Sequence, residues 1–175
     1  LGISKDIIKF IKHPYYSEIE KYLERFSSLN RENEIKKIFG KKIFNERKNN
    51  KKIIVFLSEI SDGLRKDDFI KNEEYTLMGN EETKFRTDVV LDEIFITLDK
   101  LKNNFIFTIK LHPKDDEKNY KKYSNKICKF LKNQNPLEVV FFADYVIGMT
   151  TNLLIEAAIL QKEVLSIIPR KKERN

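Results

Sequence analysis

Four short runs of apolar, mostly β-branched or aromatic residues constrain the fold of this chain more than any other feature. They cover residues 53–57, 105–111, 145–148 and 164–168, and stretches with helical spacing separate them. The first run, Ile-Ile-Val-Phe-Leu, is apolar at every position, which is typical of a strand buried on both faces of a parallel sheet. Strands that alternate with helices predict an α/β fold, a Rossmann-like open parallel sheet flanked by helices.

Helices are expected in front of these strands and between them. The apolar spacing places helices at residues 19–26, 35–39, 89–101, 123–131 and 150–161, a helical turn at residues 137–143, and a short helix or an extended lead-in at residues 3–11. Residues 41–52 are rich in Lys, Asn, Arg and Glu and are expected to form a solvated connector, and residues 58–82 an irregular excursion. The chain is therefore expected to divide into a helical lead-in, residues 1–50, and a Rossmann-like nucleotide-binding domain, residues 51–175.

The composition of the chain excludes some classes of protein but does not identify a ligand. The 175 residues carry a net charge of +7 from Lys spread over every segment, which favours an anionic ligand only mildly and equally fits a general compositional bias. No nucleic-acid groove is expected from such scattered charge. The single cysteine, Cys128, excludes an intramolecular disulfide and a multi-cysteine zinc site and fits a reducing compartment. The longest apolar run, residues 137–149, is shorter than the ~20 residues that a membrane span needs.

Polar residues follow the ends of three predicted strands. In open parallel sheets, ligands bind outside the carboxyl ends of the strands, so these residues are the candidates for binding. The candidates, counted with the residues between the polar ones, are Ser58 and Glu59 after the first strand, Lys110, His112 and Pro113 at the end of the second, and Gly148, Met149, Thr150, Thr151 and Asn152 after the third.

The segment from Thr150 to Asn152 combines hydroxyl and amide groups with the free N–H groups of a helix start, and these donors suit a phosphate. The alternative is that a threonine there only caps the helix. Glu156 lies six residues past Thr150, ~9 Å along a helix, a separation that suits ribose hydroxyls; the alternative is a solvated surface glutamate. His112, held by Pro113, is expected either to donate to phosphate with Lys110 or to act as a general acid or base.

The three segments 110–113, 143–158 and 164–167 together resemble the carboxyl-terminal half of two-domain sugar-nucleotide glycosyltransferases, the GT-B fold. Bacterial polysialyltransferase-like and capsule-building transferases, CDP-glycerol glycerophosphotransferases and non-hydrolysing UDP-N-acetylglucosamine 2-epimerases have related patterns. The resemblance implies that His112, Thr150 and Thr151 contact the donor's phosphates and that Glu156 binds the ribose. The lead-in His13-Pro14-Tyr15-Tyr16 is similar to the linker between the two domains of these enzymes.

The resemblance implies a donor-binding domain for a CMP-, CDP- or UDP-linked sugar, with no tightly bound cofactor and no metal. The product would be a bacterial surface polysaccharide or glycolipid, and a separate amino-terminal domain would bind a glycan or lipid-linked acceptor. We expect a cytoplasmic location, with at most peripheral association at the inner face of the membrane. Two alternatives stay open: a sugar-nucleotide 2-epimerase, and a non-catalytic α/β binding module.

Overall fold

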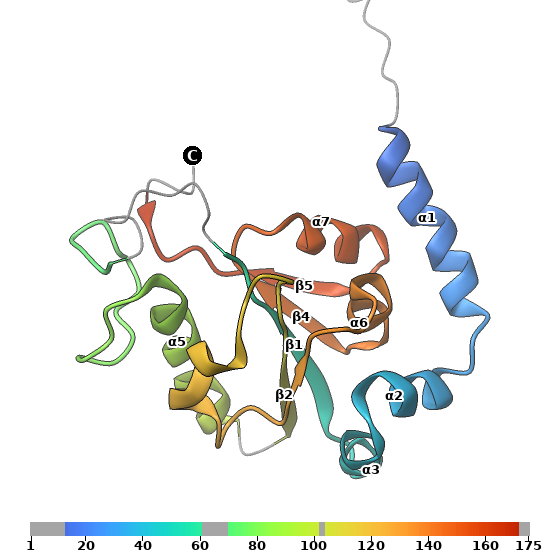
Figure 1. Ribbon diagram of the computed structural model, residues 1–175, viewed down its shortest axis with the longest axis horizontal. Helices are drawn as coiled ribbons and strands as arrows, with labels where there is room; N and C mark the ends of the chain where they lie inside the picture. Colours follow the sequence, from blue (N-terminus) through green and yellow to red (C-terminus); the bar gives the residue numbers. More distant parts are fainter. Residues whose placement is uncertain (1–12, 61–69, 102–103, 172–175) are drawn as a thin grey trace, which may run out of the picture.

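The computed structural model describes residues 13–60, 70–101 and 104–171 of the chain. Within these ranges, five strands form one parallel sheet in the order β3-β2-β1-β4-β5 (Figure 1). The strands are β1 (Lys52–Leu57), β2 (Phe105–Lys110), β3 (Lys129–Leu131), β4 (Tyr145–Gly148) and β5 (Glu163–Ser166). The predicted open parallel α/β sheet is confirmed.

Helices lie on both faces of the sheet (Figure 1). They are α1 (Pro14–Ser27), α2 (Arg31–Phe39), α3 (Lys41–Lys48), α5 (Arg86–Lys100), the 3-10 helix η2 (Glu117–Tyr123), α6 (Pro136–Phe142) and α7 (Asn152–Ile159). Several begin where the sequence offers a cap: the side chains of His13, Asn30, Asn135 and Thr151 each accept a backbone N–H of the first turn. The short helix or extended lead-in predicted at residues 3–11 lies outside the described residues, as do residues 61–69 of the excursion.

The strand β1 divides the core into two apolar clusters, because successive side chains point to opposite faces of the sheet. Ile53, Val55 and Leu57 join the cluster that contains α1, α2, α3, α6 and α7. Ile54 and Phe56 join the cluster beneath α5 and η2. The lead-in helices therefore share a core with the sheet that follows them.

Two local predictions are wrong. Residues 123–131 do not form a helix: η2 ends at Tyr123, and Lys129–Leu131 is β3, which pairs with β2. The apolar residues of so short a strand also fit helical spacing, so periodicity alone misassigned them. The predicted connector, residues 41–52, contains α3, whose Ile43 is buried beneath charged neighbours. Gly40, with a φ of 93°, ends α2 and lets α3 begin directly after it.

Asp144 ties the lead-in helices to the sheet. Its carboxylate accepts the N–H of Ile53 at 2.8 Å and forms ion pairs with Arg31 of α2 and Arg47 of α3 at 3.3 and 3.4 Å. Burial alone would raise the pKa of Asp144, but the hydrogen bond from Ile53 and the two guanidinium groups outweigh it and hold the pKa below its ordinary value. The ionised carboxylate of Asp144 thus links α2 and α3 to the strand β1.

A second buried carboxylate, Asp92 of α5, organises the described part of the excursion. It accepts the N–H of Asn80 at 3.1 Å and the hydroxyl of Tyr123 at 2.8 Å, and it also binds the hydroxyl of Thr83. The described residues of the excursion have little regular structure, as expected. Isolated antiparallel bridges at Ile70 and Phe85 and at Tyr75 and Arg170 hold them against the rest of the molecule. Every helix within the described ranges is too short or too polar to cross a bilayer.

Candidate functional site

The strand order reverses between β1 and β4, which makes their carboxyl ends the switch point of the sheet. The chain runs outward from β1 to β2 and β3 on one side, and from β4 to β5 on the other. A crevice forms at such a point because the two connections leave in opposite directions. Ser58 and Glu59 follow β1, and Met149 and Thr150 follow β4, so two of the predicted loops meet there.

Glu59 and Thr150 are in direct contact across this switch point. The N–H of Thr150 donates to both carboxylate oxygens of Glu59 at 3.1 and 3.0 Å, and the Thr150 hydroxyl contacts the same oxygens at 3.2 and 3.1 Å. The guanidinium of Arg86, a buried residue at the start of α5, forms an ion pair with Glu59 at 2.8 Å. A carboxylate thus occupies a pocket of anion-binding donors.

The start of α7 has further donors beside this carboxylate. The hydroxyl of Thr151 accepts the N–H of Leu153 at 3.3 Å, so Thr151 caps the helix, as the structural alternative predicted. Within the part of the chain that the structure describes, no acceptor binds the N–H groups of Thr151 and Asn152. These N–H groups lie at the positive end of the helix dipole and can donate hydrogen bonds to an anion.

The His112 turn is fixed to the end of β1. The N–H of His112 donates to the hydroxyl of the buried Ser58 at 2.8 Å, and its Nδ1 accepts the N–H of Lys114 at 3.3 Å. Because Nδ1 is an acceptor, neutral His112 carries its proton on Nε2, which can donate to a ligand. Among the described residues no carboxylate contacts the imidazole, and Pro113 is exposed at the tip of the turn.

Lys110 is bonded to backbone carbonyls at the ends of β2 and β3. Its ammonium donates to the carbonyls of Leu111 at 3.2 Å and Lys132 at 3.0 Å, and its side chain is buried. Burial lowers the pKa of Lys110. The interactions of Lys110 therefore hold the ends of β2 and β3 together.

Glu156 is buried on α7 and is bonded to the lead-in helix. Its Oε1 accepts the hydroxyl of Tyr15, in the first turn of α1, at 2.5 Å, and the residue is 9% exposed. The solvated surface glutamate that the sequence left open is therefore excluded. The hydrogen bond to Glu156, followed by burial, raises the pKa of Tyr15 to about 12, so Tyr15 is protonated and donates at neutral pH. Asn152, one turn earlier, is exposed.

The structure gives Gly148 and Met149 packing roles. A Cβ on Gly148 would meet the side chain of Leu154 at 3.2 Å, so the missing side chain lets α7 pack closely against β4. Met149 is buried, with its sulfur 3.0 Å from the Arg86 guanidinium. Met149 thus supports the Arg86–Glu59 pair from inside the core.

One cavity borders the switch point, and a second lies along the sheet. The first, of about 410 Å³, is lined by Glu59, Asp88, Asp115 and Tyr120, among others, and its carboxylates disfavour phosphate. The second, of about 530 Å³, lies between α5 and the β4–β5 half of the sheet, where apolar side chains such as Ile147 and Leu165 line it. The described residues contain no cluster of His, Cys, Asp and Glu able to hold a metal ion. The donors for an anion therefore lie on the α7 side of the switch point.

The sequence reasoning missed two residues of this site. Arg86 was not singled out, although a cation in the first turn of a helix opposes the helix dipole and so indicates a nearby anion. Tyr15 was treated only as part of the linker, and no local pattern reveals its contact with a residue 141 positions away. The bonds of Ser58 and Glu59 bring the His112 turn and Thr150 to one edge of the sheet, whereas Glu156 is bonded to α1.

The comparisons with known proteins give structural likeness only. No family model matches the sequence, and no curated protein matches it. Two solved structures of KpsC from Thermosulfurimonas dismutans are similar to this chain. The beta Kdo 2,7 transferase has 17% identity over 83% of this chain and a TM-score of 0.43. The beta Kdo 2,4 transferase has 13% identity over 90% of this chain and a TM-score of 0.42. The wall teichoic acid polymerase TagF has 14% identity over 94% of this chain and a TM-score of 0.38. This chain spans 44%, 46% and 34% of those three chains.

Proposed function

We propose that this chain is the donor-binding domain of a glycosyltransferase of the surface-polysaccharide type, and that it binds the diphosphate or phosphate of a CMP-, CDP- or UDP-linked sugar at the start of α7. The observation that carries the proposal is the contact of the Glu59 carboxylate with the N–H and hydroxyl of Thr150 at the switch point of the sheet. Arg86 offsets the charge of Glu59, and the two further N–H donors at the start of α7, those of Thr151 and Asn152, have the chemistry for phosphate.

The remaining residues would extend this site along α7. Nε2 of His112 would donate to the phosphates from the neighbouring turn, and Glu156 would accept from the ribose hydroxyls. The sequence resemblance to GT-B transferases assigns the same roles to these residues. Acceptor binding and a catalytic base would come from a separate domain, so the proposal limits this chain to binding the donor.

Nucleotide binding tests the proposal directly. We expect CMP, CDP or UDP to bind the chain in a calorimetric titration. We expect Thr150→Val to weaken binding about tenfold, because it removes the hydroxyl that would turn from Glu59 to donate to the phosphate. Thr97→Val, on the exposed face of α5, is the matched control and should leave the affinity unchanged. Absence of binding by all three nucleotides and by their sugar conjugates would end the proposal.

A further inference from the structure

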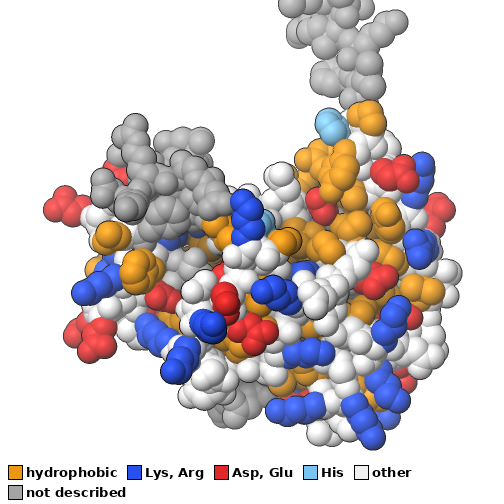
Figure 2. All heavy atoms as spheres, viewed as in Figure 1, with side chains coloured by type: hydrophobic (Ala, Val, Ile, Leu, Met, Phe, Trp, Pro, Cys, Tyr) orange, Lys and Arg blue, Asp and Glu red, His pale blue; other side chains and the backbone are white. Residues whose placement is uncertain are grey.

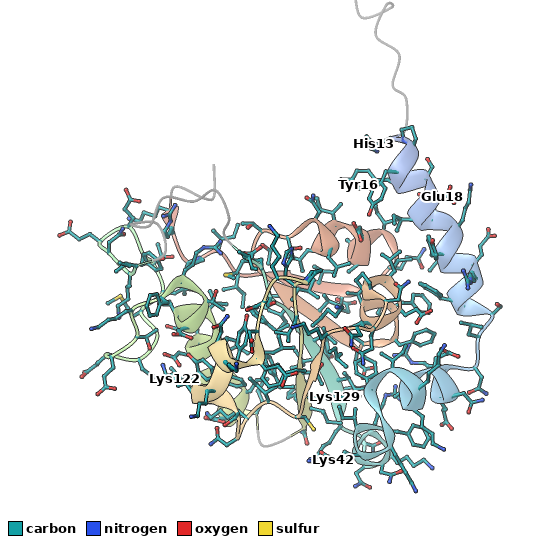
Figure 3. The ribbon with its side chains drawn as sticks, in the orientation of Figure 1. His13, Tyr16, Glu18, Lys42, Lys122 and Lys129 are labelled. Atoms are coloured by element: carbon teal, nitrogen blue, oxygen red, sulfur yellow. The ribbon has the colours of Figure 1, made fainter. Side chains whose placement is uncertain are left out.

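The amino end of α1 places an aromatic cluster beside the one carboxylate proposed to bind ribose. The cluster consists of His13, Tyr15 and Tyr16: the ring centroids are 5.2 Å apart for His13 and Tyr16, 5.7 Å for the two tyrosines and 6.5 Å for His13 and Tyr15. Figure 3 shows Tyr16 on the side of α1 that faces α7. These rings lie at the end of a helix that packs against α7.

The rings of Tyr15 and Tyr16 are partly accessible to solvent. Tyr15 is 49% exposed, although its hydroxyl reaches a buried carboxylate, and Tyr16 is half-buried. Figure 2 shows hydrophobic side chains gathered at this end of α1. An aromatic surface that stays accessible beside a polar anchor is suited to stacking on a flat ligand ring.

The hydrogen bond from Tyr15 leaves half of the Glu156 carboxylate available. Oε1 is taken by the tyrosine hydroxyl, and among the described residues no donor contacts Oε2. A carboxylate with one oxygen fixed and one open has a defined orientation, so it can select a ligand with a hydroxyl at one position.

We propose that α1 forms the nucleoside side of the site: Tyr15 is a positioning residue that orients Glu156 toward the ribose hydroxyls, and the ring of Tyr16 is the surface on which the nucleobase stacks. This inference rests on the proposed function, and it assigns base recognition and the orientation of the ribose-binding carboxylate to α1, a helix that precedes the sheet in the sequence. The nucleotide would run from the start of α7, where its phosphates are held, past Glu156 to the amino end of α1.

Ligands that lack one part of the nucleotide separate the two roles. For Tyr15→Phe, which keeps the ring, we expect the affinity for CMP and for ribose 5-phosphate to fall about fivefold, and the affinity for 2′,3′-dideoxy-CMP to stay the same. For Tyr16→Leu we expect about tenfold weaker CMP binding with ribose 5-phosphate unchanged, because only the stacked base is lost. Tyr22→Phe, on the same helix with its ring against Phe26, is the matched control.

The outcomes distinguish this inference from the proposed function. Thermal melts followed by circular dichroism identify variants that fail to fold, and a Tyr16→Phe variant, which keeps an aromatic ring, should bind CMP like the wild type. Suppose that the wild type binds CMP. The inference then fails, and the proposed function stands, if Tyr15→Phe weakens the binding of CMP and of dideoxy-CMP equally, or if Tyr16→Leu binds CMP as tightly as the wild type. If the wild type binds no nucleotide or ribose phosphate, both fail.

Discussion

Arg86→Met is expected to lower the free energy of unfolding by about 3 kcal/mol, because it removes the partner of a carboxylate that is itself nearly buried. The Arg86 side chain is 2% exposed and that of Glu59 11%. Methionine fills most of the volume but leaves Glu59 without a counter-ion, and desolvation of that charge is then only partly offset by Thr150. Urea denaturation of the wild type and the variant measures the difference.

Two further variants identify the cause of this loss. Arg86→Met combined with Glu59→Gln should be more stable than Arg86→Met alone, because the second change removes the unpaired charge. Arg25→Met, at an exposed position of α1, should change stability by less than about 0.5 kcal/mol. A double variant no more stable than Arg86→Met would show that packing, and not charge, accounts for the effect.

Asp144→Asn is expected to cost about 2 kcal/mol at neutral pH, since it weakens the hydrogen bond to Ile53 and removes the charge that pairs with Arg31 and Arg47. The folded pKa of Asp144 lies below its ordinary value of 3.8, so the folded state binds its proton less readily than the unfolded chain. Its contribution is therefore complete above pH 3.8 and is lost as the pH falls through the folded pKa.

The difference between Asp144→Asn and the wild type should accordingly shrink in acid. Unfolding free energies measured at intervals from pH 7 to about pH 2.5 would detect this convergence. Asp99→Asn is the matched control, because Asp99 is exposed and its one ion pair among the described residues is with Lys126 at 2.7 Å. A difference that stays constant across this range would mean that the charge of Asp144 does not stabilise the fold.

The sheet could be predicted from the sequence because its central strands carry strong local signals. Residues 53–57 are apolar at every position and buried, and residues 105–110 are mostly apolar and mostly buried; such runs are typical of parallel strands covered on both faces. The strand β3 has three residues, and the helix α3 has eight with one fully buried side chain, so neither has a period that can be read with certainty. Their structures depend on β2 and on the shared core.

The candidate site was predictable where it follows strand ends and unpredictable where it depends on tertiary contacts. Ser58, Glu59, His112 and Thr150 were singled out because parallel strands end at one edge, and their bonds do connect the three loops. Which anion Thr150 faces could not be predicted, because Glu59 lies 91 residues away in the chain. The environments of Lys110 and Glu156 were equally out of reach, since carbonyl acceptors and a distant tyrosine decide them.

The core shared by the lead-in helices and the sheet has a mechanical consequence. Phe26 of α1 packs against Phe141 and Phe142 of α6, and Asp144 clamps α2 and α3 to β1. A displacement of α1 is therefore transmitted to Glu156 instead of being absorbed in the connections between the helices. Any movement of α7 would therefore carry α1 with it as part of the same rigid body.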